Sequence, residues 1–97
     1  MSNLKQSLGH AVSIGVGSSR AIGPNPFRTT LILSPPTSDR YSVAFGESAV
    51  LDRGITIHTG TVPLKLTADE IGDSITKPVN VIGSGVISAG MLETYTA

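Results

Sequence analysis

The chain contains no cysteine and no tryptophan, and it is poor in charge. Without cysteine it has no disulfide framework and no thiolate nucleophile, which disfavours a small secreted scaffold stapled by disulfides. Charged residues make up 14% of the chain, against about 25% in typical proteins. The seven Lys and Arg residues balance the seven Asp and Glu residues and are scattered among them. We therefore expect no nucleic-acid binding.

Long hydrophobic runs are also missing. No apolar stretch approaches the length of a membrane span, and the segment after Lys5 is interrupted by Gly9, His10 and Ser13, unlike the apolar region of a signal peptide. We expect no membrane insertion and a protein made in a cytoplasm. A length of 97 residues with only four aromatic side chains predicts one domain whose thin core is filled by Val, Ile and Leu.

Short apolar runs that alternate with polar residues dominate the rest of the chain. Tyr41, Val43 and Phe45 share one face of such a run. In a second run, Val62, Leu64 and Leu66 share one face. Clusters of proline, glycine and serine separate the runs. The pattern predicts an all-β fold, a single β-sandwich or jelly-roll-like domain of about eight short strands. The expected strands are residues 10–16, 20–22, 27–33, 41–45, 55–58, 62–66, 79–82 and 86–95.

Three local features refine this prediction. Pro35-Pro36 marks a reversal, so residues 27–33 and 41–45 are expected to form a hairpin-like pair. Thr67 and Glu70 have the spacing of a capping box and predict a single helical turn that ends at Gly72. Gly90 is expected to form a bulge or bend in the last strand. The expected inward-facing residues are Val43, Phe45, Ile55, Ile57, Leu64 and Leu66.

The N-terminal segment has too few apolar residues to fold alone. We expect residues 1–9 to form an arm that becomes ordered only against a neighbouring subunit, and residues 10–97 to form the β-sandwich domain. Leu4 and Leu8 are the apolar side chains of this arm. They are therefore the candidate partner-interface residues.

No motif for catalysis, a cofactor or a metal is complete. Residues 15–20 begin like a dinucleotide fingerprint, but Arg20 replaces the third glycine and no helix pattern follows. Ser48 lies in a partial nucleophile elbow that lacks its closing glycine. His10 and His58 have no neighbouring ligand at metal spacing. We expect a protein that is not an enzyme, with no cofactor and no metal.

One family resemblance covers about two thirds of the chain, and its segments are residues 28–33 (RTTLIL), 41–46 (YSVAFG), 53–57 (RGITI), 63–66 (PLKL), 79–82 (VNVI) and 85–95. Their succession resembles small virion proteins of tailed bacteriophages, the head decoration or cement proteins and related minor head proteins. The chain departs from that pattern in its long connection over residues 15–26 and in Pro35-Pro36.

The resemblance implies a compact β-sandwich or jelly roll that binds the outside of an assembled capsid and bridges neighbouring shell subunits. The implied partner is the major capsid protein, and the implied location is the virion surface. Few edge charges predict in addition a homo-oligomer, a dimer or a trimer, or else a monomer that associates only on its shell. The alternative is a small ligand- or carbohydrate-binding module, although such a module normally displays exposed aromatics for stacking on sugars. A third possibility is a jelly-roll enzyme of the cupin type. Such an enzyme would need paired metal histidines, and the sequence lacks them.

Overall fold

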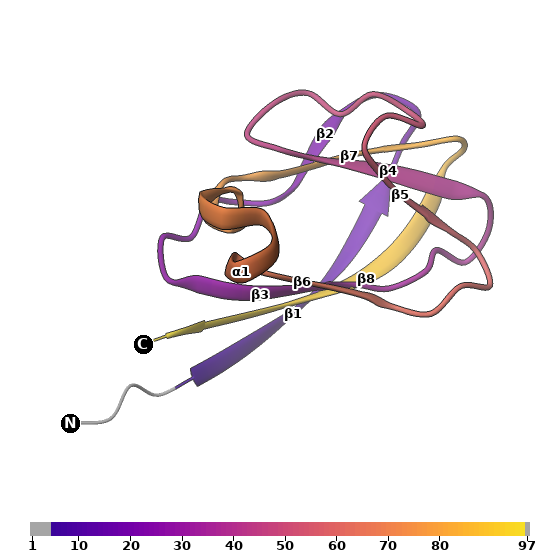
Figure 1. Cartoon of the computed structure of the whole chain (residues 1–97). Coiled ribbons are helices and arrows are strands. Elements are labelled where there is room, and N and C mark those ends of the chain that lie inside the picture. The colour runs from indigo at the N-terminus through magenta and orange to yellow at the C-terminus, as the bar shows by residue number, and fades with distance from the viewer. Residues whose placement is uncertain (1–4, 97) are drawn as a thin grey trace.

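The computed structural model describes residues 5–96, which form two four-stranded antiparallel sheets packed face to face (Figure 1). The all-β sandwich expected from the alternating pattern is confirmed. The strands are β1 (Lys5–Ile14), β2 (Ser19–Ile22), β3 (Arg28–Leu33), β4 (Arg40–Phe45), β5 (Ile55–His58), β6 (Leu64–Thr67), β7 (Val79–Gly83) and β8 (Ile87–Thr96).

The strand order is that of a jelly roll. The first sheet runs β1-β8-β3-β6 and the second runs β2-β7-β4-β5. The steps β1 to β2, β3 to β4, β5 to β6 and β7 to β8 each cross from one sheet to the other. Because the sheets are antiparallel, these four connections lie together at one end of the sandwich, which we call the loop end. Both described chain ends lie at the opposite end (Figure 1).

The predicted hairpin between β3 and β4 is wrong, because these strands belong to different sheets. After β3 the chain continues alongside β8: the Ser34 N–H donates to the Gly90 carbonyl at 3.0 Å and the Thr37 N–H to the Ser88 carbonyl at 3.2 Å. Pro35-Pro36 between them offers no donor and keeps the chain extended. The segment therefore crosses to the second sheet instead of folding back beside β3.

The core lies between the sheets and is made mainly of Val, Ile and Leu. Among the predicted inward-facing residues Val43, Ile57 and Leu66 are buried, while Phe45 and Ile55 are partly buried against the core. Leu64 is exposed at the start of the edge strand β6. The fully buried side chains include Ile14, Leu31, Leu33, Tyr41, Ile75, Val79 and Val81.

The first strand begins earlier and ends earlier than the sequence predicts. It spans Lys5–Ile14, so residues 5–9, expected to belong to an arm, are paired with β8 from Thr96 to Leu92. Backbone hydrogen bonds to the long strand β8 hold this segment, which does not need a core of its own. Leu4 lies outside the described residues.

One helical turn joins β6 to β7, as the capping-box spacing predicts. Helix α1 (Ala68–Ile71) begins where the Thr67 N–H donates to Glu70 Oε1 at 3.2 Å, and it ends at Gly72 with a positive φ of 60°. The 3-10 helix η1 (Gly72–Thr76) follows and buries Ile75. The predicted bulge at Gly90 is wrong, because β1 and β8 keep one register along their whole length.

Candidate functional site

Strand β1 forms an edge of the first sheet and pairs with β8 alone. On β8, Ser88 and Gly90 accept hydrogen bonds from the segment after β3, so their main-chain groups point away from β1. The main-chain N–H and C=O groups of successive residues in a strand point to opposite sides. Those of Ala89 and Met91 therefore point toward β1. Their partners on β1 are Val12 and His10. The odd-numbered residues of β1 consequently present their N–H and C=O groups to solvent.

We call this row of main-chain groups, carried by Ser7, Gly9, Ala11 and Ser13, the free edge. All four residues are exposed, and all have small uncharged side chains. Proteins that stay monomeric usually protect such an edge with lysine, proline, a bulge or a covering loop. Residues 6–14 contain no Lys, Arg, Asp, Glu or Pro, and their register shows no bulge. The free edge is thus available for pairing with another strand.

The even-numbered side chains of β1 face the second sheet, but that sheet covers only part of them. Val12 and Ile14 are buried in the core, whereas Leu8 is 50% exposed. Figure 1 shows the N-terminal part of β1 and the C-terminal part of β8 extending together beyond the second sheet. Leu8, predicted from the sequence as an interface residue, therefore lies on the uncovered half of the strand, next to the free edge. Its role in an interface stays a prediction.

A shallow hollow of about 370 Å³ lies beside the free edge. Its floor is made by small residues of β1 and β8, among them Ala11, Ser13 and Ser88, and Pro35 and Thr37 form its far wall. The hollow lies over the outer face of β1 and β8, so no large side chain on this face stands beside the free edge.

A buried polar cluster lies where the covered half of β1 meets the uncovered half. The Glu93 carboxylate on β8 accepts a hydrogen bond from Asn25 Nδ2 at 2.9 Å and lies 3.0 Å from His10 Nε2. Arg28 Nη2 approaches the same carboxylate at 3.4 Å. Burial alone would raise the pKa of Glu93, but Asn25, the Arg28 charge and His10 together outweigh it and lower that pKa.

Arg28 is the buried centre of this cluster. Its Nη1 donates to the carbonyls of Ile75 and Lys77 at 2.9 and 3.0 Å, and its Nη2 donates to the carbonyl of Gly23 at 2.6 Å. Its Nε has no hydrogen-bond partner among residues 5–96. The guanidinium therefore joins β3, η1 and the loop before β3. This is the geometry of a structural clamp, and it leaves Glu93 fully engaged and unable to act as a free base.

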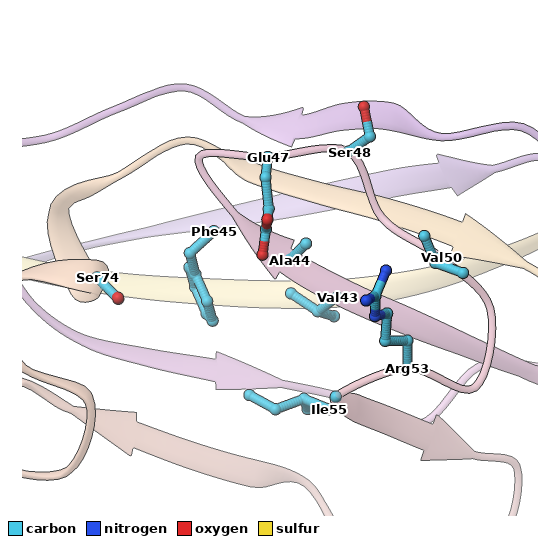
Figure 2. A pocket seen from close by; sticks show the side chains of 10 residues that line it. Val43, Ala44, Phe45, Glu47, Ser48, Val50, Arg53, Ile55 and Ser74 are labelled. Carbon is cyan, nitrogen blue, oxygen red and sulfur yellow. The ribbon is translucent and has the colours of Figure 1, made fainter.

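A second hollow, of about 390 Å³, opens where β4 extends past β5. Figure 2 shows Glu47 and Arg53 reaching from the β4–β5 loop over strand β4, with Phe45 and Ile55 below them. Both charged residues are exposed. Within residues 5–96, no group of three or more His, Cys, Asp or Glu side chains is placed to hold a metal ion. No helix in the same range has the length and apolar character to cross a membrane.

Exposed valines gather at the loop end. Val16, Val62 and Val86 are 68%, 82% and 87% exposed. They lie in the connections β1–β2, β5–β6 and β7–β8, which topology brings to the same end of the sandwich. The β1–β2 and β7–β8 connections touch, because the Gly83 N–H donates to the Gly15 carbonyl at 2.8 Å. The loop end thus carries exposed apolar side chains and lies at the opposite end of the sandwich from the uncovered half of β1.

Comparison with known proteins supports the fold. No protein-family model matches the chain, and no curated protein matches it. A solved structure from work on Bacillus endospore appendages, a family of disulfide-linked pili, has a similar fold. Its TM-score is 0.62 at 11% sequence identity, over 97% of this chain and 88% of that one. At this identity the likeness establishes the shared fold alone.

Sequence reasoning missed both the free edge and the buried cluster. The alternation of Ser7, Gly9, Ala11 and Ser13 is a signal for a strand with one small-residue face, but residues 5–9 are too polar to be recognised as a strand from apolar spacing. Arg28, His10 and Glu93 are far apart in sequence. Only the order of the first sheet brings β1, β8 and β3 side by side.

Proposed function

We propose that this chain is a structural protein that binds the outside of an assembled bacteriophage capsid and stabilises it by bridging neighbouring shell subunits. In this proposal it acts without catalysis, and its partner is the major capsid protein. The specific assignment to a capsid rests on the resemblance of its strand segments to decoration and cement proteins.

The free edge is the observation that supports a structural role most directly. A long unprotected strand edge is a liability for a protein that works alone, and it is useful for one that works in an assembly. The pilus structure supports this view in a general way, since a similar fold serves there as a subunit of an assembly. This chain has no cysteine, so any assembly it forms is held without disulfides.

The loop end is the surface that we propose to contact the shell. Val16 and Val86, on the touching β1–β2 and β7–β8 connections, supply an apolar contact of the kind found in the centre of protein interfaces, and Val62 adds an exposed valine at the opposite edge of the same end. The zero net charge of the chain offers no long-range attraction to a strongly charged surface. The loop end and the uncovered half of β1 lie at opposite ends of the sandwich, so contact at the loop end would leave the uncovered half of β1 free.

Binding to purified capsid shells tests the proposal. We expect the protein to cosediment with shells of tailed phages and to raise the temperature at which they open. The double variant Val16→Ser, Val86→Ser should bind at least about tenfold more weakly, because each buried valine contributes roughly 1.5 kcal/mol or more. A control with Phe27→Ser changes an exposed apolar residue just before β3, at the opposite end of the sandwich, where the Phe27 carbonyl accepts from the Thr96 N–H. Absence of binding to any such shell would overturn the capsid assignment.

A ligand-binding module is the second candidate, and the hollow beside β4 favours it. Glu47 and Arg53 flank an apolar floor there, an arrangement that suits a small ligand with both polar and apolar parts. Titration calorimetry with a panel of soluble glycans, on the parent protein and on Arg53→Ala, separates the two candidates. Saturable binding that is lost in Arg53→Ala would support the ligand-binding function.

A further inference from the structure

We propose that two copies of this chain associate through their β1 strands, paired antiparallel about a two-fold axis beside Gly9. The pairing would join the two first sheets into one continuous sheet. The dimer itself follows from the geometry of β1, whereas its use in bridging a shell rests on the proposed function.

The direction of the main-chain groups makes this edge self-complementary. A two-fold axis perpendicular to the sheet keeps the inner faces of both copies on the same side. Directly opposite residues have their side chains on the same face, and in β1 the even-numbered side chains face inward and the odd-numbered ones outward. Opposite residues must therefore both be odd-numbered or both be even-numbered. The edge-facing residues are all odd-numbered, and Gly9 is the middle one between Lys5 and Ser13. With Gly9 opposite Gly9 of the second copy, every edge-facing residue from 5 to 13 finds a hydrogen-bonding partner.

The side chains allow the two strands to meet. On the outer face, Ser7 would lie opposite Ala11 of the second copy, and the two Gly9 residues would meet at the axis, so no bulky group stands in the way. On the inner face, Leu8 would lie opposite His10 of the second copy. The exposed half of Leu8 would thereby be covered by the His10 ring of the second copy and would in turn shield the contact between His10 and Glu93 from solvent. No two like charges face each other between residues 6 and 12.

The shape of the molecule also fits a second copy. The two-fold axis places the uncovered half of one β1 beside the covered half of the other. Each copy therefore sets the body of its sandwich next to the overhanging strand of its partner, where the single copy has an exposed inner face (Figure 1). An unrelated strand would satisfy the hydrogen bonds of the free edge but would not bring the body of a second sandwich beside Leu8. This difference favours a second copy as the occupant.

The dimer would have two loop ends that point in opposite directions, because its β1 strands are antiparallel. A cement protein needs two separate contacts to hold neighbouring shell subunits together. A dimer of this form would supply them from one binding surface used twice, with the gain in avidity that a bivalent ligand has.

Single cysteines test the geometry, since the chain has none of its own. Only a residue at the two-fold axis lies opposite the same residue of the second copy. Opposite residues that are hydrogen-bonded to each other have Cα atoms about 5.5 Å apart, which is inside the range for a disulfide. An added Cβ at position 9 meets only Leu92 Cδ1, at 4.0 Å, so Gly9→Cys has room to fold. We expect Gly9→Cys to form an intermolecular disulfide at least roughly tenfold faster than Ser7→Cys or the loop control Ser48→Cys.

Other results would overturn the proposal. If Leu8→Cys or His10→Cys crosslinks fastest, the two-fold axis does not lie at Gly9. If Gly9→Cys and Ser48→Cys crosslink at equal rates, the two copies do not pair through β1. Light scattering supplies a second measurement without cysteine: the parent should be dimeric, Ala11→Lys on the free edge monomeric, and Ser88→Lys, one strand inward on the same face, dimeric. A monomeric parent at high micromolar concentration also contradicts the dimer. These experiments use no shells, so their failure and a failure of shell binding are separate results.

Discussion

The two halves of strand β1 are parts of one ladder but differ in what lies over them. From Lys5 to Ile14 every residue is paired with β8 in a single register. Yet Ile14 and Val12 are buried under the second sheet, while Leu8 is half exposed. Hydrogen bonds to β8 are therefore enough to define the conformation of the first half, but burial stabilises only the second. An ordered and uncovered strand is well suited to a partner, because little conformational entropy is lost on binding.

The buried polar cluster marks the boundary between the halves. His10 is the last inward-facing residue of β1 before Leu8, and it contacts Glu93 rather than an apolar neighbour. Arg28 closes the same end of the core from β3. The core thus ends in charged groups that are satisfied internally, and the overhang begins beyond them. Four predictions test this contrast between the halves.

The largest effect is expected at the boundary. Arg28→Met removes the hydrogen bonds to Gly23, Ile75 and Lys77 and leaves the Glu93 carboxylate buried without its cation. We expect the free energy of unfolding to fall by about 3 to 5 kcal/mol, as measured by urea denaturation.

A double variant provides the control for this prediction. If the loss in Arg28→Met comes from the unpaired carboxylate, Arg28→Met combined with Glu93→Leu should recover part of it, because no uncompensated charge remains. A single variant as stable as the parent would show that the cluster does not clamp this end of the core.

The next effect compares the two halves directly. Ile14→Ala in the covered half should destabilise the fold by about 2 to 5 kcal/mol, because it leaves a cavity between the sheets. Leu8→Ala in the uncovered half should cost about 1 kcal/mol or less for the monomer, since half of this side chain already faces solvent. Thermal and urea melts at low protein concentration measure both. Equal losses would mean that the overhang contributes to the core.

A third effect depends on pH. The folded protein lowers the pKa of Glu93 below 4.5, so its carboxylate contributes stability at pH values above about 4.5 that is lost as the pH falls through the lowered pKa. The parent should therefore lose more stability than Glu93→Gln between pH 6 and about pH 3. Asp52 is the control, because its pKa is also lowered, by the hydrogen bond from exposed Arg40, against a smaller opposing effect of burial. High salt should screen the Asp52 contribution more than that of Glu93.

The sequence was sufficient for the fold class because the covered strands carry their own signal. Tyr41, Val43 and Ile57 alternate with polar residues since the second sheet packs one face against a core. The order of the strands was not readable in the same way. Pro35-Pro36 predicts a hairpin turn after β3, but hydrogen bonds to Gly90 and Ser88 carry this segment along β8, and those partners lie far ahead in the chain.

The candidate site was predictable only in part, for the same physical reason. Leu8 was identified as an apolar residue without a local partner, and the structure places it half exposed on β1. The segment around it was expected to be an arm, because residues 5–9 have no apolar period. Pairing with β8 defines this strand, and pairing depends on a distant segment rather than on the local pattern.

The smallest predicted effect is a gain in stability within the uncovered half. Gly9 has no positive φ, and an added Cβ would only touch Leu92 Cδ1, at 4.0 Å. Gly9→Ala should therefore stabilise the monomer by about 0.4 to 1 kcal/mol, because alanine loses less backbone entropy on folding than glycine. Melts of the parent and of Gly9→Ala in an Ala11→Lys background, which removes association, measure this gain. A loss of stability there would mean that the uncovered half is strained, and hence that pairing with β8 alone does not determine its conformation.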